Sequence, residues 1–381
     1  MSFDLAIFAD KLRRYRDQLK TNVEEMATAT GIAADRLRAL ESGSLEPSGD
    51  EVLILADYFH CDFKFFVSNE KLAPFEETET LYRRFGDRLS REDRWAIQEL
   101  LFLCENEAFL MDQLARNPRT SFAFVKKGNY VKGNATRAAA ELRQHLGIAP
   151  REVHMDIFAD LRAIGVHVFR RRLASSDISG LFIQHPTAGK CVLVNYEQDV
   201  YRQRFTAAHE GCHAILDADQ PFVVSFARWD PKDLAEIGAN VFASHYLVPD
   251  DTLAGLRSVT WSATTVVEAA TRLSVNTDTL VFRLEDAGYV DQALSVELRR
   301  HRVPRTAKSD PELPSSLTAA SRTRKEELLQ RGLSNHYVAL CFNAHEQGVV
   351  TRARLAEMLL AHDTELAELR ALFHGGARAP G

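Results

Sequence analysis

The sequence predicts a mainly α-helical protein that contains one smaller α+β domain. Three observations lead to this prediction. Apolar residues recur at helical spacing through residues 5–67, which indicates an all-α N-terminal domain. Short apolar runs around Pro186 and Gly189 indicate a small antiparallel sheet further along the chain. A helix over residues 201–216 follows directly, and its sequence carries two histidines and a glutamate among apolar residues.

Length and composition limit the classes of protein to consider. Because domains commonly span about 100–200 residues, a chain of 381 residues should hold two or three of them. The net charge of −6 means that any contact with nucleic acid must come from a local patch. The five cysteines are far apart and include no Cys-x-x-Cys pair, which favours reduced thiols in the cytoplasm. The sequence shows no signal peptide and no apolar stretch of about 18 residues, so we expect no membrane contact.

Changes in sequence character divide the chain into four segments. We expect a helix-turn-helix domain, a helical linker or bundle, an α+β domain, and a basic linker followed by C-terminal helices, at residues 1–70, 76–150, 151–295 and 296–381 respectively. The second segment is helical and charged, which is typical of a bundle that links two domains.

The N-terminal domain contains two short helices joined by a glycine-containing turn, over residues 23–29 and 33–40. The second helix is amphipathic with arginines on its outer face, which is the helix-turn-helix pattern. The segment LRRYRDQLKTNVEEMATATGIAADRLRALESGSLEPSGDEVLILADYF resembles the XRE (Cro/repressor-like) family along most of its length. The resemblance implies that the second helix is the recognition helix, with Asp35, Arg36 and Arg38 facing the DNA groove.

The charge of this domain argues against tight binding of DNA. Residues 1–45 carry seven Lys/Arg and seven Asp/Glu, so this part of the chain is neutral. Neutralisation of phosphates supplies much of the affinity of proteins for DNA, so the domain should bind DNA weakly unless it is dimeric. A helix-turn-helix that serves for contact with another protein is the alternative.

The third segment begins with a helix and continues with three short strands. We expect the helix over residues 153–164 and the strands over 166–169, 178–183 and 191–195. The last two strands are separated by turn residues and form a plausible antiparallel hairpin. This part of the chain is therefore α+β, with a small sheet covered by helices.

The helix after the hairpin carries the sequence His209-Glu210-Gly211-Cys212-His213. Histidines at positions i and i+4 lie on one face of a helix, so their imidazoles can bind a single zinc ion. Glu210 lies to one side, where it can orient a water molecule and take its proton. The pattern predicts a metallopeptidase site, because burying two histidines and a glutamate on one turn is costly without a partner.

A catalytic zinc site of this kind needs a third protein ligand, and Asp219, Glu236 and His245 are candidates. Asp219 would suit an extended motif with a turn glycine, but Leu216 stands at the position of that glycine. Glu236 begins a second helical run that can pack antiparallel to the first. Two histidines and one glutamate leave a fourth position open for water, which is the catalytic arrangement. We therefore choose Glu236.

Two segments together resemble the ImmA/IrrE family of zinc metallo-endopeptidases, namely GLFIQHPTAGKCVLVNYEQDVYRQRFTAAHEGCHAILD and EIGANVFASHYLVP. The matching residues are Asn195, Arg202, Arg204, Phe205, His209, Glu210, His213, Glu236, Ala239, Asn240, Phe242, Ala243 and Pro249. The resemblance covers about residues 150–290 and implies a zincin-like domain. It also implies that His209, His213 and Glu236 bind Zn²⁺ and that Glu210 is the general base.

Two further residues near the motif have more than one interpretation. His245 lies nine residues after Glu236 and is predicted as a second catalytic residue that stabilises an oxyanion. The alternative for His245 is a histidine on the helix surface. The sulfur of Cys212 could reach the metal or act as a redox latch, and the alternative is a small buried residue.

The C-terminal quarter is basic at first and then helical. Residues 298–331 hold nine Lys/Arg against four acids and are interrupted by prolines, which is typical of a solvated linker. A strip that senses nucleic acid is the alternative interpretation. The later helices carry a leucine stripe that suits packing or formation of a homodimer.

These features predict a cytoplasmic regulatory zinc endopeptidase with a DNA-binding module at residues 1–70. The family resemblance implies limited proteolysis of a protein substrate, such as a transcriptional repressor or antitoxin, in a stress or phage response. The alternative is a sequence-specific transcriptional regulator whose zincin domain serves in sensing or assembly.

Overall fold

The structure is a computed structural model, and its chain folds into two compact units. It describes residues 3–59, 61, 63–69, 76–85, 88–116, 121–227 and 232–374. The first unit comprises residues 1–105 with the short segments 173–175 and 185–187, and the second comprises the remainder of the chain. No helix of the described ranges is both long and apolar enough to cross a membrane.

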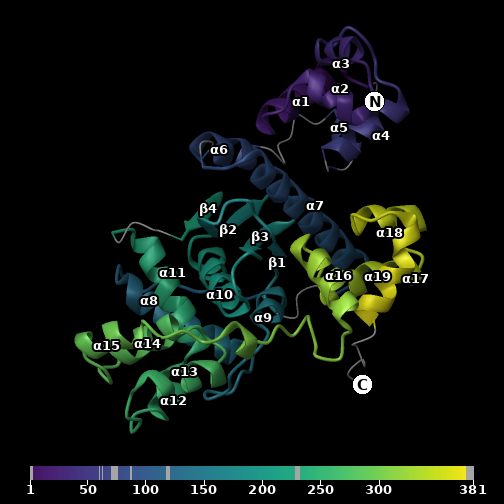
Figure 1. Ribbon diagram of the computed structural model, residues 1–381. Coiled ribbons are helices and arrows are strands. Elements are labelled where there is room, and N and C mark those ends of the chain that lie inside the picture. Colours follow the sequence, from purple (N-terminus) through teal and green to yellow (C-terminus); the bar gives the residue numbers. More distant parts are fainter. Residues whose placement is uncertain are drawn as a thin grey trace. The chain divides into compact units, whose positions relative to one another are not determined.

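The first unit is all-α, as the sequence predicts (Figure 1). Its N-terminal domain consists of α1 (Leu5–Gln18), α2 (Val23–Thr30), α3 (Ala34–Glu41), α4 (Gly49–Tyr58) and α5 (Phe63–Val67). Their inner faces share one core, whose largest members are Phe8, Tyr15, Phe59 and Phe66. Two further helices follow, α6 (Glu76–Phe85) and α7 (Arg91–Gln113).

Local sequence signals define the ends of the helix-turn-helix pair. The side chain of Asn22 accepts a hydrogen bond from the amide of Glu25 at 2.8 Å and so caps α2. Gly31 ends this helix with φ of +72°, a conformation that favours glycine. The two helices therefore lie within one residue of the predicted ranges at each end.

The second unit contains the remaining helices and the sheet. Its elements are α8 (Val131–His145), α9 (Ile157–Ala163), β1 (Val166–Arg171), β2 (Ile178–His185), β3 (Gly189–Asn195), α10 (Val200–Leu216), β4 (Phe222–Phe226), α11 (Leu234–Leu247), α12 (Asp250–Ala254), α13 (Ala263–Arg272), α14 (Thr277–Asp286), α15 (Gln292–Leu298), η1 (Arg305–Ala307), α16 (Ala319–Gln330), α17 (Asn335–Glu346), α18 (Arg352–Met358), η2 (Asp363–Glu365) and α19 (Leu366–His374).

The predicted fold class, mainly helical with one small sheet, is confirmed, and the sheet is mixed rather than antiparallel throughout. Its strand order is β1-β3-β2-β4. Strand β3 turns back from β2 and lies between β2 and β1, so it runs parallel to β1 with Val166 opposite Lys190. The fourth strand, β4, pairs antiparallel with β2 and was not predicted. A five-residue apolar run is too short for its periodicity to distinguish a strand from a helix.

Helix α10 lies at the centre of this unit. It packs against β3 on one side and against α11 on another, and α11 in turn packs against α8 (Figure 1). Gly211 allows a close approach to α9, because a Cβ atom at this position would lie 2.6 Å from a methyl carbon of Leu161. The HExxH sequence is therefore held from several sides by one continuous hydrophobic core.

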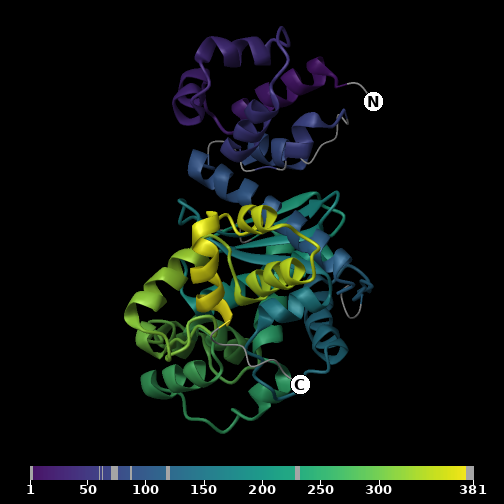
Figure 2. The ribbon, with the colours of Figure 1, turned by 90° about the vertical axis from the view of Figure 1, so that its right-hand side faces the viewer.

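The C-terminal helices also belong to this unit, and α16 contacts β1 (Figure 2). The amide of Arg172 donates a hydrogen bond to the carbonyl of Gln330 at 2.8 Å. Along the basic strip, Lys308 forms an ion pair with Asp199 at 2.8 Å, and Arg299 forms one with Glu285 at 3.0 Å. The interpretation of residues 298–331 as a merely solvated linker is therefore corrected, because these basic side chains bind acids of the preceding domain.

Candidate metal centre

Helix α10 brings the two motif histidines to one buried position. The side chain of Asp199 caps the helix by accepting hydrogen bonds from the amides of Tyr201 and Arg202. His209 and His213 then lie one turn apart, with ring centroids 5.0 Å from each other. His209 is 6% exposed and His213 is fully buried, so both imidazoles lack solvent as a partner.

Each imidazole is oriented by a side-chain oxygen behind it. The Nδ1 atom of His213 lies 2.8 Å from a carboxylate oxygen of Asp217, and that of His209 lies 3.2 Å from the amide oxygen of Asn240. An acceptor at Nδ1 leaves the Nε2 lone pair to face the site, as in metal-binding histidines. The two Nε2 atoms accordingly face each other at 3.3 Å.

Glu236 completes the cluster from the first turn of α11, where Asp233 caps the helix. Its carboxylate oxygens lie 3.4 Å from Nε2 of His209 and 3.5 Å from Nε2 of His213. Ligands about 2.0–2.1 Å from a tetrahedral zinc ion lie roughly 3.3–3.4 Å apart. The two Nε2 atoms, and the carboxylate oxygen of Glu236 nearest to each of them, therefore already lie close to the spacing that zinc requires. In the described part of the chain, this is the one group of three such residues that could hold a metal ion.

The electrostatics of the cluster favour a bound cation. Burial opposes the charge of Glu236, but its hydrogen bonds to both histidines lower its pKa to about 2. Burial also lowers the pKa of His213, yet Asp217 and Glu236 outweigh burial and raise that pKa to about 10. Burial lowers the pKa of His209, and the charge of His213 lowers it further. One imidazole thus carries the positive charge that the carboxylates demand, and a metal ion can take the place of that proton.

Glu210 lies beside the cluster and is fully buried. Neither carboxylate oxygen has a hydrogen-bond partner in the described residues. Burial raises its pKa to about 8, and the charge of His213 and the hydroxyl of Ser225 offset this only in part. A desolvated carboxylate with a raised pKa is suited to accept a proton near neutral pH.

Gly180 on β2 provides the space for this carboxylate. A Cβ atom at Gly180 would lie 2.8 Å from Oε1 of Glu210 and 2.7 Å from a methyl carbon of Thr206. Gly180 was not predicted from the sequence as part of the site. A glycine inside a predicted strand is nevertheless a signal of close approach by another group.

The structure does not bring His245 to the metal cluster. Nine residues of α11 separate it from Glu236, which corresponds to about 13 Å along a helix. His245 instead accepts a hydrogen bond from Arg283 at 3.1 Å and lies near Asp250 and Asp286. The expectation that His245 stabilises an oxyanion is therefore corrected to a structural role at the end of α11. Cys212 is buried, and burial raises the pKa of its thiol.

The predicted DNA-contacting residues lie on α3 but are already paired. Arg36 donates two hydrogen bonds to Glu51, both at 2.8 Å, and Arg38 pairs with Glu24 and with Asp35. Arg36 thus connects α3 to α4, and contact of Asp35, Arg36 and Arg38 with a DNA groove stays a prediction.

The geometry of the cluster identifies a class of site, and two family models match the chain. A helix that bears two histidines, with a glutamate from a second helix, defines a metallopeptidase type of site. Residues 161–285 match the IrrE N-terminal-like domain of the peptidase family M78, and residues 12–66 match the helix-turn-helix family HTH_3. The chain thus joins an XRE-type helix-turn-helix domain to a domain of the ImmA/IrrE metallopeptidase family, as predicted from the sequence. No curated protein was found to match the chain.

Replacing Asp217 by Asn should weaken zinc binding by about 10–100-fold, the usual effect of losing a partner that orients a ligand. The carboxylate that holds Nδ1 of His213 at 2.8 Å would become an amide, so the ring would lose its charged acceptor. Asp219→Asn is the matched control, two residues further along the chain. Competition with a chromogenic chelator measures both affinities, and equal affinities for the two variants would contradict the assigned role.

Replacing Glu51 by Gln should destabilise α4 by about 1 kcal/mol at pH 7, as expected for a partly exposed ion pair. The hydrogen bond from Arg36 lowers the pKa of Glu51 from 4.5 to about 2. The stabilisation is therefore complete above about pH 4.5 and is lost as the pH falls towards 2. Hydrogen exchange of residues 49–58 in the full chain should show a difference from the native protein that shrinks between pH 7 and pH 3. Glu46→Gln is the control, and a pH-independent difference would contradict this account.

Proposed function

We propose that the protein is a zinc-dependent endopeptidase whose metal ligands are His209, His213 and Glu236. The single observation that supports this most is that the two Nε2 atoms and the two carboxylate oxygens of Glu236 approach one another to 3.3–3.5 Å, beside a second buried glutamate. Three protein ligands leave a fourth position open, which is typical of catalytic rather than structural zinc. Structural zinc sites usually have four protein ligands.

Different residues of this chain carry out different parts of the proposed reaction. Zinc bound here would supply Lewis acidity that polarises a scissile carbonyl and acidifies water. Glu210 accepts the proton of the attacking water and passes it to the departing amine. Asp217 and Asn240 hold the imidazoles in the orientation that the ligands need. Burial of Glu210 in the surrounding core raises its pKa and so keeps its proton affinity high.

A protein substrate is favoured over a small molecule by the position of β4. This strand forms the edge of the sheet, and its Ser225 lies close to Glu210. A sheet edge can receive an extended peptide as a further strand through main-chain hydrogen bonds. The peptide would then run past the general base, as an endopeptidase requires.

We further propose that the peptidase is regulatory and that its substrate is a transcriptional repressor or an antitoxin, cleaved in a stress or phage response. The fusion of the peptidase-family domain to a helix-turn-helix domain supports this proposal, because the second domain can bring the first to DNA-bound proteins. The five cysteines are thiols, which suits a reducing compartment such as the cytoplasm.

The alternative, a transcriptional regulator with a non-catalytic zincin domain, has less support from the charges. Residues 12–66 carry seven Lys/Arg and ten Asp/Glu, so the helix-turn-helix domain repels phosphates overall. In cells, Glu210→Gln discriminates between the two functions. Regulation that survives this replacement but requires the first 70 residues would favour the transcriptional regulator.

The direct test is cleavage of candidate repressors. The zinc-loaded full chain is incubated with repressors encoded near its own gene, and the products are measured by intact mass. We expect one cleavage that a chelator abolishes and that Glu210→Gln lacks. Absence of chelator-sensitive cleavage of every such repressor, by a chain that does bind zinc, would contradict the proposed function.

A further inference from the structure

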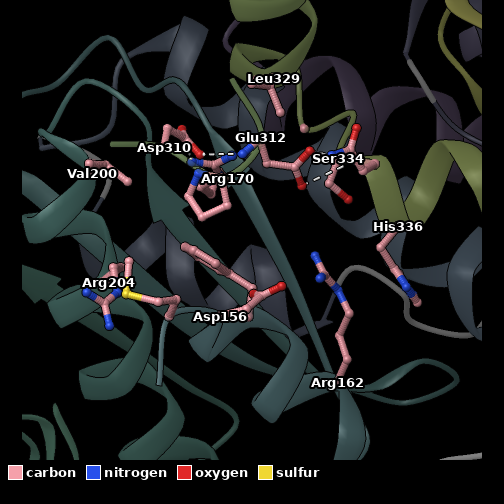
Figure 3. A pocket seen from close by; sticks show the side chains of 15 residues that line it. Asp156, Arg162, Arg170, Val200, Arg204, Asp310, Glu312, Leu329, Ser334 and His336 are labelled. Atoms are coloured by element: carbon pink, nitrogen blue, oxygen red, sulfur yellow. Dashed lines mark hydrogen bonds and ion pairs between the residues drawn. The ribbon is translucent and has the colours of Figure 1, made fainter. Parts of the chain in front are cut away.

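A separate pocket of about 140 Å³ lies in the second unit and includes none of the proposed metal ligands (Figure 3). Its walls come from α9, β1 and α10 of the peptidase-family domain and from residues 310–336 of the C-terminal region. Nothing in the proposed peptidase chemistry uses this pocket. Its charged lining consists of Asp156, Arg162, Arg170, Arg204, Asp310, Glu312 and His336.

Three arginines of the lining carry buried N–H groups without a hydrogen-bond acceptor in the described residues. These groups are Nε of Arg162, Nη2 of Arg170 and Nε of Arg204. Nε of Arg162 nevertheless forms an ion pair with a carboxylate oxygen of Glu107 at 3.8 Å. Arg170 is 7% exposed and Arg204 is 2% exposed, so neither side chain relies on bulk solvent. Leaving a buried donor without an acceptor is costly, and the donors of Arg170 and Arg204 indicate that a partner is missing.

The acidic groups of the lining are already engaged in hydrogen bonds. Asp310 accepts a hydrogen bond from Nη1 of Arg170 at 2.6 Å, and the carboxylate of Glu312 accepts one from the amide of Asn335 at 3.0 Å. Asp156 caps α9 by accepting a hydrogen bond from the amide of Ala159 at 3.0 Å. The unsatisfied groups are therefore donors, and a ligand must supply acceptor oxygens.

We propose that this pocket binds a small oxyanion, a carboxylate or phosphate group on a compact body. Arginine is the side chain best matched to both groups, because its planar guanidinium presents several donors. Phe158 and Leu329 supply apolar contact for the body of the ligand. A volume of 140 Å³ is close to that of a cavity that holds benzene, about 150 Å³, which sets the expected size.

A ligand bound in this pocket would act on α10, which contributes to its walls. Arg204 lies on this helix five residues before His209, and Arg170 donates a hydrogen bond to Gln203 of the same helix at 3.2 Å. Two sites that share one rigid helix can influence each other, and the influence is reciprocal. On the proposed function, which this step requires, the oxyanion is an effector of the metal centre.

The test is calorimetric titration of the full chain with inorganic phosphate in one arm and succinate in the other. We expect saturable binding of at least one anion, and the better of the two identifies the group that the pocket prefers. Arg162→Met should weaken that binding at least about tenfold, the equivalent of 1.4 kcal/mol. Arg352→Met removes an exposed arginine outside the pocket and is the matched control, expected to bind as the native chain does.

A second variant distinguishes a loss of anion binding from a folding defect. Met155 is 40% exposed and lines the pocket, so Met155→Glu places a carboxylate there without disturbing the buried arginines. It should also weaken binding. No saturable binding of either anion would overturn the proposal, and so would binding that both pocket variants retain, which would mark an adventitious ion only. These measurements need no peptidase activity, so their failure is separate from failure of the proposed function.

Discussion

Glu210→Gln should reduce peptide cleavage by about 10²–10⁴-fold, the usual contribution of a positioned general base. The replacement keeps the size of the side chain but removes its ability to accept a proton. Because Glu210 is not among the three grouped donors, zinc content should stay unchanged. The expected result is therefore a chain that binds zinc and does not cleave.

The measurement pairs metal analysis with cleavage of the same substrate by the native chain and the variant. The stability of the variant provides an independent check. Burial raises the pKa of Glu210 to about 8, so its ionisation opposes folding of the metal-free protein as the pH rises from about 4.5 to 8. The metal-free variant should then gain thermal stability over the native chain across this range. Full activity in the variant would contradict the role of Glu210.

Glu236→Gln and His213→Ala should each weaken zinc binding by more than about 100-fold. Loss of a hydrogen-bond partner that orients a ligand weakens metal binding by about 10–100-fold, and loss of the ligand itself should have a larger effect. Each removes one of the three residues whose Nε2 atoms and carboxylate oxygens approach one another to 3.3–3.5 Å. Two remaining donors cannot enclose zinc, and water would have to fill the vacated position.

His245→Ala is the matched control for both variants, since it removes a histidine from the same helix as Glu236 but at its other end. Zinc affinity should remain at the native value in this variant. Affinities are measured by competition with a chromogenic chelator. A loss of affinity in His245→Ala equal to that of His213→Ala would contradict the assigned ligand set.

The parts of the site that the sequence predicted are local to single helices. The spacing of His209 and His213 follows from helical geometry, and Glu236 follows from a second run with the same periodicity. The wrong prediction that His245 acts at the metal centre also arises from helical geometry. Proximity in sequence on a helix means separation along its axis, so a residue nine positions away lies too far from the cluster.

The features that the sequence did not predict depend on long-range pairing. The pairing of β1 with β3 requires a choice of neighbour that strand periodicity does not contain. The ion pair of Arg170 with Asp310 joins residues 140 positions apart, and it explains why a basic, proline-rich strip is ordered. The pairing of Arg36 with Glu51 depends on how α3 and α4 meet, which composition alone does not specify.

The close contact of Gly180 with Glu210 has an evolutionary consequence. A glycine inside a strand costs roughly 0.5–1 kcal/mol relative to alanine, and a buried carboxylate without a partner costs more. Glu210 lowers stability in the protein without substrate, so folding alone gives no reason to keep it. Gly180 does have such a reason, because a Cβ atom there would also lie 2.8 Å from the main-chain oxygen of Leu193. A copy of this gene that had lost its chemistry would therefore be expected to change the codon of Glu210 early and to keep that of Gly180. Inactive descendants should be recognisable by an apolar residue in the middle of α10 together with a retained glycine in β2.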